Sequence, residues 1–239
     1  FRESVPRERP MNTDVIVLGA GIVGVSAALH LQKRGRAVVL LDRKGVAEET
    51  SYGNTGIIQT EAAEPYPFPQ ELSKILRYAL NLAPDANLHW SAIPKMAPAL
   101  FRYWRNGRPE QIKASAEAWI PLARICLAEH EALMREAGVT ASMRRTGYLK
   151  LYRDPVALEM AIAADKRAHD TYGISYKSVD AKGVLELEPH LRSGFAGGVL
   201  MPDSVSVGDP SALGKAYGEL FVQRGGRIVR GEARTLDAT

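Results

Sequence analysis

The apolar positions near the start of the chain follow a strand pattern, then a helix pattern, then a strand pattern again. Residues 13–18 and residues 37–41 are short β-branched and apolar runs, which predicts two buried strands. Residues 22–34 lie between them, and Gly35 stands where a helix commonly ends. The apolar side chains of this middle segment recur at helical spacing, at Val25, Ala28, Leu29 and Leu31. A strand, a helix and a strand within about 30 residues favour parallel pairing through a right-handed crossover.

The rest of the chain is predicted to mix helices and strands. Residues 70–137 are helical in pieces separated by prolines, and the longest piece covers 109–137. Its apolar stripe contains Trp119 and Cys126, and we expect both to pack in a core. The other predicted elements are a strand over 142–153, a helix after Pro155, a short helix capped by Asp180, a strand over 195–201, a helix over 210–224 and strands over 227–230 and 232–236.

Composition and charge exclude several classes of protein. The net charge of +4 over 239 residues is too small, and the basic residues too scattered, to favour a nucleic acid partner. The single cysteine excludes an intramolecular disulfide and indicates a reducing compartment, so we expect a cytoplasmic location. No run approaches the roughly 18 apolar residues of a membrane span. Residues 1–10 carry three arginines and two glutamates without the apolar centre of a signal peptide, and we expect a disordered leader there.

The motif that carries the chemistry is G-x-G-x-x-G at Gly19, Gly21 and Gly24. The first glycine makes a tight turn out of the strand, and the second lets the backbone approach a pyrophosphate. The third lets the helix pack closely, with its N-terminus facing the phosphate charge. Asp42 follows the second strand, where a carboxylate binds ribose hydroxyls and disfavours a 2′-phosphate, so NADP is not expected. A glycine-rich turn of another α/β fold is the alternative, but the strand, helix and acid all favour a dinucleotide.

The glycines alone do not distinguish NAD from FAD. Another α/β unit commonly follows soon in an NAD domain, whereas residues 49–58 here form a polar loop. Its hydroxyls, amide and small side chains suit a ribityl chain and a flavin edge. Two alternatives stay open: a solvent loop rich in turn-forming residues, and an NAD-dependent dehydrogenase.

These residues resemble the D-amino-acid oxidase and dehydrogenase superfamily of FAD enzymes, and most closely the small-subunit type of bacterial D-amino-acid dehydrogenase. The first motifs are Gly19 to Gly24 with Asp42-Arg43, then Thr50-Ser51-x-x-Asn54-x-Gly56. Weaker markers follow in order to the end of the chain, at 147–152, 187–189, 197–199, 202–203, 209–210, 225–228 and 231–236. The resemblance therefore covers nearly the whole chain from Met11.

The resemblance implies a non-covalently bound FAD and a set of residues that hold it. The pyrophosphate would be lined by Gly19, Gly21, Ile22, Val23 and Gly24. Asp42 and Arg43 would hold the adenosine end, and the backbone of Ala233, where relatives often have valine, would meet the adenine. The ribityl and flavin part would lie along Ser51, Asn54, Thr55, Gly56 and Ile57.

The implied reaction oxidises a D-amino acid to a 2-oxo acid and ammonia, by hydride transfer from the substrate Cα to flavin N5 and hydrolysis of the imino acid. Quinone or dioxygen would accept the electrons. The alternatives are a glycine or sarcosine type of amine oxidase and a catalytically silent fragment. This chemistry needs no protein nucleophile, and the five histidines lack metal-ligand spacing, so we predict no metal and nominate no catalytic residue.

The implied fold is α/β, with an FAD-binding, Rossmann-like parallel sheet and an incomplete α+β substrate domain. We expect the cofactor domain to comprise 11–61 and 206–239, and the substrate domain 62–205. Family members usually run well past this length, and the end at Thr239 lies within apparent strand structure, so we expect a truncated chain in which most substrate-carboxylate ligands are missing.

The stretch from Leu72 to Trp104 leaves two interpretations open. It combines leucines and aromatic residues with arginines, which is typical of a segment in peripheral contact with a membrane, here the inner membrane. Amphipathic helices that cover the cofactor domain would show the same pattern.

Overall fold

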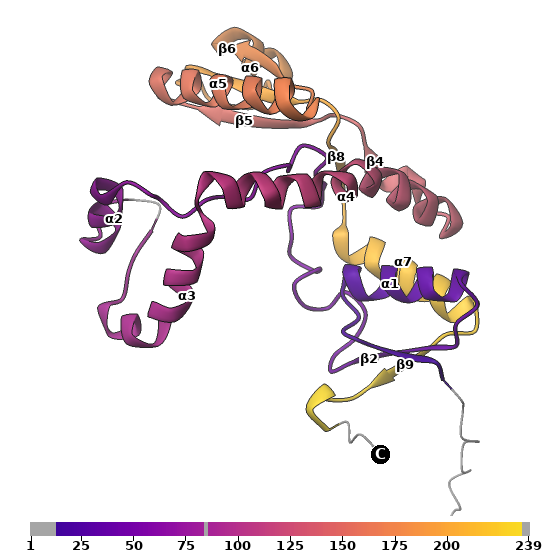
Figure 1. Ribbon diagram of the computed structural model, residues 1–239. Coiled ribbons are helices and arrows are strands. Elements are labelled where there is room, and N and C mark those ends of the chain that lie inside the picture. Colours follow the sequence, from indigo (N-terminus) through magenta and orange to yellow (C-terminus); the bar gives the residue numbers. More distant parts are fainter. Residues whose placement is uncertain (1–12, 84–85, 236–239) are drawn as a thin grey trace, which may run out of the picture. The chain divides into compact units, whose positions relative to one another are not determined.

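The computed structural model describes residues 13–83 and 86–235, and the chain divides into two compact units (Figure 1). Unit 1 comprises Phe1–Ile58, Ala128–Tyr148 and Ser204–Thr239, and unit 2 comprises Gln59–Leu127 and Leu149–Asp203. The leader expected at residues 1–10 lies outside the described residues.

Unit 1 is built on a parallel sheet. β1 (Val15–Leu18), β2 (Val38–Asp42) and β9 (Arg227–Arg230) lie in the order β1-β2-β9. The predicted parallel pairing of the first two strands is confirmed, with Val15 opposite Val38. β9 returns from the far end of the sequence to pair in parallel with β2.

Two helices with small and apolar faces pack beside this sheet. α1 (Ile22–Lys33) and α7 (Pro210–Gln223) contact one another, as Figure 1 shows. Tyr217 and Phe221 of α7 are fully buried in the same cluster as Leu29 of α1. The C-terminal part of the long helix α4 (Pro109–Glu136) adds Leu133 and Met134 to this core. On the other face of the sheet, Ile16 and Leu18 are exposed.

A second sheet of unit 1 is antiparallel and very short. Its order is β3 (Ile57–Ile58), β8 (Val205–Val207) and β4 (Met143–Arg144), and the single turn η2 (Thr140–Ser142) precedes β4. Strands of two or three residues leave no periodic signal in a sequence, and neither β3 nor β8 was predicted.

Unit 2 contains a third sheet and several helices. The sheet has the order β5 (Tyr148–Tyr152), β7 (Gly197–Met201) and β6 (Lys177–Asp180), with α5 (Pro155–Tyr172) and α6 (Ala181–Leu187) packed on β7. Lys150 on β5 forms an ion pair of 2.8 Å with Asp165 on α5. The remaining helices are α2 (Leu72–Ala79), the turn η1 (Trp90–Ala92) and α3 (Ile93–Asn106).

The prediction of a strand over 142–153 is confirmed for Tyr148–Tyr152 (β5), but it was wrong in making one continuous strand of this stretch. Gly147 has a φ of 78°, and the chain turns there, so that β4 and β5 belong to different sheets. The strand expected at 232–236 is also absent from the described residues. Ala233–Thr235 form a single 3₁₀ turn, η3, and the pairing of β9 with β2 ends where Arg230 lies opposite Asp42.

The prediction that Trp119 packs in a core was also wrong, because 52 % of its surface is exposed. α4 instead buries the small side chains of Ala116 and Ala123. Cys126 is half-buried, and burial raises the pKa of its thiol.

Candidate cofactor-binding site

The loop between β1 and α1 makes the close turn that its glycines predict. Gly19 has a φ of 99°, a conformation that side-chain-bearing residues rarely adopt. A Cβ atom on Gly24 would lie 1.8 Å from the carbonyl oxygen of Gly19. The helix can therefore approach the end of β1 only because residue 24 has no side chain.

The carboxylate of Asp42 lies against this loop. Its Oδ2 atom accepts a hydrogen bond of 2.8 Å from the backbone N–H of Ala20, and its Oδ1 atom accepts one of 2.8 Å from Lys44. Each carboxylate oxygen has a second lone pair, so the group can still accept hydrogen bonds from the hydroxyls of a ligand. The structure thus brings together the acid and the glycines that the sequence singled out.

The N-terminus of α1 is suited to an anion. The first N–H groups of a helix have no acceptor within the helix, and the helix dipole makes this end positive. The N–H of Ile22 donates to the hydroxyl oxygen of Ser51 at 2.9 Å, and no acidic residue lies in the first turn. A Cβ on Gly21 would lie 3.2 Å from the same hydroxyl oxygen. A bare backbone at Gly21 therefore lets the buried Ser51 reach the helix, while Val23 and Gly24 follow in the first turn.

The polar loop predicted to follow the flavin closes on β8. Asn54 Oδ1 accepts a hydrogen bond of 2.8 Å from the N–H of Gly56, and the carbonyl oxygen of Gly56 accepts one of 2.7 Å from Val207. Gly56 has a φ of 67°, and a Cβ there would lie 2.4 Å from the carbonyl oxygen of Val207. The loop therefore requires glycine at this position for two reasons, its backbone conformation and its close contact.

A small cavity of about 100 Å³ is lined both by the start of α1 and by the polar loop predicted to follow the flavin. It is lined by Ile22, Asn54, Gly56, Ile57, Ile58, His130, Val207, Pro210 and Leu213. Four of these residues were predicted to contact the cofactor. The others come from β3, β8, α4 and the start of α7, which only the tertiary structure brings to this place.

His130 was not predicted, and it is the one ionisable residue in the described lining of this cavity. Its Nδ1 atom lies 3.2 Å from the hydroxyl oxygen of Tyr217, and that hydroxyl donates to the carbonyl oxygen of His130 at 3.1 Å. Both groups are satisfied when Nδ1 carries the proton and donates to Tyr217. Burial lowers the pKa of His130 and raises that of Tyr217, which keeps both groups neutral near pH 7.

Three other predicted residues have no hydrogen bond to the glycine loop among the described residues. The Arg43 guanidinium binds Glu49, with 2.7 Å between Nη2 and Oε1, and this pair raises the pKa of Arg43 and lowers that of Glu49. Thr55 and Ala233 are exposed. Among the described residues, no hydrogen bond joins either of them to the glycine loop.

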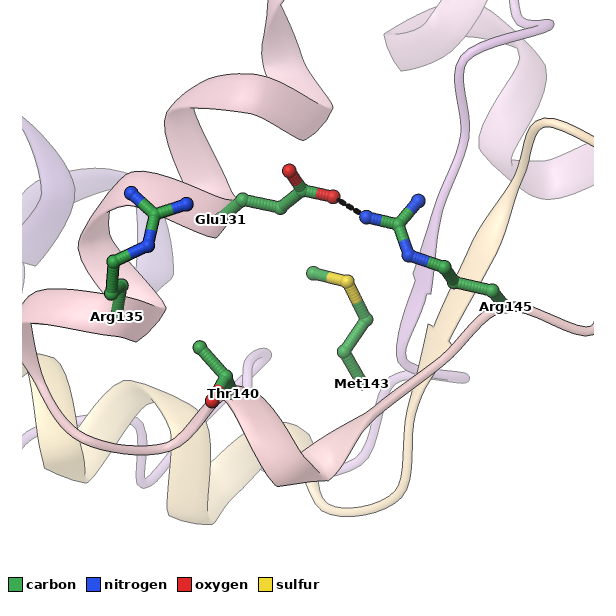
Figure 2. A pocket seen from close by; sticks show the side chains of 5 residues that line it. All are labelled: Glu131, Arg135, Thr140, Met143 and Arg145. Carbon is green, nitrogen blue, oxygen red and sulfur yellow. Dashed lines mark hydrogen bonds and ion pairs between the residues drawn. The ribbon is translucent and has the colours of Figure 1, made fainter.

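A separate pocket of about 250 Å³ in unit 1 is lined by Glu131, Arg135, Thr140, Met143 and Arg145 (Figure 2). Arg145 forms an ion pair with Glu131 across it. None of these lining residues was predicted to contact a cofactor, so this pocket lies outside the predicted site.

The family model of FAD-dependent oxidoreductases, DAO, matches residues 14–239. The chain belongs to this family. FAD is the cofactor of the family, which confirms the cofactor inferred from the glycine loop and the polar loop together. The individual FAD-binding residues stay predictions.

A relative agrees with this assignment, and solved structures share the fold. D-amino acid dehydrogenase 1 of Mesorhizobium japonicum is 32% identical over 215 residues, which are 88% of this chain and 51% of the relative. L-amino acid deaminase from Proteus vulgaris superposes with a TM-score of 0.64 at 18% identity, over 100% of this chain and 44% of that one. Glycine oxidase from Bacillus cereus superposes with a TM-score of 0.55 at 19% identity, over 91% of this chain and 46% of that one. The α/β fold is therefore confirmed, and the chain spans about half the length of the curated relatives it matches.

Proposed function

We propose that this chain binds FAD non-covalently and that the protein oxidises D-amino acids to 2-oxo acids and ammonia. The contact of Asp42 with the glycine loop carries the cofactor part of this proposal, since a carboxylate there can hold the ribose while the amides of α1 face the phosphates. The D-amino acid dehydrogenase at 32% identity supports the reaction.

Each group of predicted residues would bind a different part of FAD. Gly19, Gly21, Ile22, Val23 and Gly24 would offer backbone N–H groups to the pyrophosphate, and Asp42 and Arg43 would hold the adenosine with the backbone of Ala233. Ser51, Asn54, Thr55, Gly56 and Ile57 would follow the ribityl chain and the flavin edge. The fit is supported by the bare backbone at Gly21 and by the absence of an acidic side chain in the first turn of α1.

FAD would supply the two-electron oxidation of the substrate Cα–N bond, and water then releases ammonia from the imino acid. The chain's own residues would orient the cofactor and exclude water from it. Ile22, Ile57 and Ile58 give the cavity apolar walls, and neutral His130 and Tyr217 place no fixed charge beside it. The groups that bind the substrate carboxylate are not assigned to this chain.

A glycine or sarcosine type of amine oxidase is the second candidate. Its support is the superposition on glycine oxidase, whose 19% identity carries the fold alone. The electron acceptor, quinone or dioxygen, stays open between the two candidates. Within the described part of the chain, no helix has the length and apolarity needed to cross a bilayer.

Two measurements test the proposal. Addition of FAD to the purified chain should quench flavin fluorescence in a saturable way, whereas NADH should not compete. Anaerobic addition of D-alanine, L-alanine or glycine to the FAD-loaded, full-length protein should bleach the flavin absorbance with D-alanine most rapidly. A chain that binds no FAD would contradict the cofactor assignment. Bleaching that is most rapid with glycine would favour the second candidate, and bound FAD that no amine reduces would indicate a silent protein.

A further inference from the structure

The imidazole of His130 is fixed in place by Tyr217. Its Nδ1 atom lies 3.2 Å from the hydroxyl oxygen of Tyr217, and this hydroxyl donates to the carbonyl oxygen of His130 at 3.1 Å. Since the hydroxyl hydrogen is used in the second bond, the first bond requires the proton to be on Nδ1. The two rings are also stacked, with 6.1 Å between their centroids and 22° between their planes. The tautomer and the orientation of the imidazole are therefore set before any ligand binds.

This arrangement leaves the other ring nitrogen, Nε2, as a hydrogen-bond acceptor. In a neutral imidazole the nitrogen without hydrogen has a lone pair, and burial lowers the pKa of His130, which keeps the ring neutral near pH 7. Within the described part of the chain, no hydrogen bond reaches Nε2. An acceptor in a partly buried residue that lacks a donor costs free energy, so a bound molecule that donates to Nε2 would be favoured.

The cavity that His130 lines has one other polar side chain among its described lining residues, that of Asn54. Asn54 Oδ1 accepts the N–H of Gly56, whereas no acceptor for Asn54 Nδ2 is found among the residues described. A hydroxyl group can donate to an imidazole nitrogen and accept from an amide N–H at the same time. The other side chains that line the cavity are apolar, which suits the carbon atoms of a chain. The chemistry of the cavity therefore fits a carbon chain that bears hydroxyl groups.

The size and the place of the cavity select one part of FAD. Its volume of about 100 Å³ equals that of roughly three water molecules at about 30 Å³ each, so the fused rings of a flavin need more room. It is lined by Ile22 at the start of α1, where the pyrophosphate is expected, and by Asn54 of the polar loop, where the flavin edge is expected. The ribityl chain joins these two parts of FAD, and it carries a hydroxyl on successive carbons.

We propose that His130 contacts the cofactor directly, and that its Nε2 accepts a hydrogen bond from a ribityl hydroxyl of FAD while Asn54 donates to the same part of the chain. Tyr217 is then a positioning residue, which acts through the imidazole. The inference rests on the proposed function, because it requires FAD at the glycine loop. It adds to that site a residue of α4, which neither the glycine motif nor the polar loop contains.

The test compares FAD with ADP, which has the adenosine and the pyrophosphate but no ribityl chain, on FAD-free, full-length protein. His130→Leu removes the acceptor and should weaken FAD binding by about threefold to tenfold, as one lost hydrogen bond does, with ADP affinity within about twofold of the wild type. His130→Gln retains a neutral acceptor and should keep most of the FAD affinity. His190→Leu, at an exposed histidine, is the matched control. Fluorescence titration measures FAD binding, and calorimetry measures ADP binding.

A second measurement uses the wild-type protein, so it does not depend on the folding of any variant. In protein with ¹⁵N-labelled histidine, FAD should shift the Nε2 resonance of His130, because the lone pair of that nitrogen accepts a hydrogen bond. ADP should leave the resonance in place. The loss of the resonance in His130→Gln identifies it among the five histidines.

Four results would overturn this inference and leave the cofactor assignment intact. The first is a His130→Leu protein that binds FAD as tightly as the wild type, and the second is an equal loss of affinity for FAD and ADP. The third is an equal loss of FAD affinity in the Leu and Gln variants, and the fourth is an Nε2 resonance that FAD does not move. Protein that binds neither FAD nor ADP would instead contradict the proposed function, and this inference with it.

Discussion

Oδ2 of Asp42 lies 2.8 Å from the backbone nitrogen of Ala20, so the end of β2 is tied to the glycine loop that begins α1. The same carboxylate also accepts the N–H of Lys44 through its other oxygen. Asp42 is therefore part of the fold before it contacts any ligand. Under the proposed function, changes at this residue should affect both stability and cofactor affinity, and a control is needed to separate the two.

Asp42→Ala should lower the free energy of unfolding by about 1 to 3 kcal/mol, because two backbone N–H groups lose a charged acceptor. It should also weaken FAD binding by about tenfold or more, since the ribose loses the same acceptor. Asp14→Ala is the matched control, because Asp14 Oδ2 accepts a bond of 2.8 Å from the N–H of Ala37 at the other end of β1. Urea unfolding and fluorescence titration with FAD measure the two effects. Equal FAD affinity in the two variants would remove Asp42 from the cofactor site.

Gly24→Ala should destabilise the protein by about 3 kcal/mol or more, because its methyl group would overlap the carbonyl oxygen of Gly19 and no flexible side chain can move aside. Gly208→Ala is the control, since the nearest heavy atom to a Cβ there is Arg144 Nη2 at 3.7 Å. We expect that control to change stability by less than about 1 kcal/mol. Thermal and urea unfolding measure both variants, and a Gly24→Ala protein of unchanged stability would contradict the close packing of α1.

His130 predicts a specific pH dependence of stability. Burial lowers the pKa of His130 in the folded protein, so below its ordinary value of 6.5 the unfolded chain binds the proton more readily. The free energy of unfolding should therefore fall as the pH drops below about 6.5, until the folded pKa is reached. His130→Gln should flatten this dependence between pH 7 and 5.5, and His190→Gln, at an exposed histidine, is the comparison variant. Urea unfolding over this pH range measures the effect. Parallel curves of unfolding free energy against pH for the wild type and His130→Gln would contradict the contribution of His130.

Tyr217→Phe removes the hydroxyl that contacts two polar atoms of His130. Because the Tyr217 side chain is fully buried, the hydrogen bonds of this hydroxyl are made inside the protein, and we expect a loss of about 1 to 3 kcal/mol in the free energy of unfolding. Val222→Ala on the same helix, at a half-exposed position, should cost less. A Tyr217→Phe protein as stable as the wild type would show that the hydroxyl contributes nothing.

Glu136 of α4 connects to two other helices through Lys33 on α1 and Arg224, the C-cap residue of α7. The Lys33 ammonium, and after it Arg224, lowers the pKa of Glu136, so its contribution is present above about pH 4.5 and is lost as the pH falls through the folded pKa. The three side chains are about one third exposed, which limits the contribution to about 1 kcal/mol or less. Glu136→Gln should reduce the acid sensitivity measured between pH 5 and 3, compared with Glu219→Gln at an exposed position of α7.

The site could be predicted where its chemistry lies in consecutive residues. Gly19, Gly21 and Gly24 combine with a strand before and a helix after them, and Asp42 follows at the end of the next strand. Local sterics and periodicity are enough for that unit, and the structure confirms its parallel pairing. The helix expected at 109–137 likewise agrees with α4, because an amphipathic run of that length has a strong period.

Sequence by itself determined the glycine loop, its acid and the first βαβ unit, since these depend on backbone sterics and on neighbours within about 30 residues. The tertiary structure alone decided that β9 pairs with β2, that Ser51 reaches the N–H of Ile22 and that His130 meets Tyr217 across 87 residues of chain. It also decided that Trp119, Leu76 of α2 and Phe101 of α3 are exposed, which periodicity could not distinguish from burial. The physical reason is that a hydrophobic pattern shows which side of an element is apolar, whereas only packing determines what covers that side.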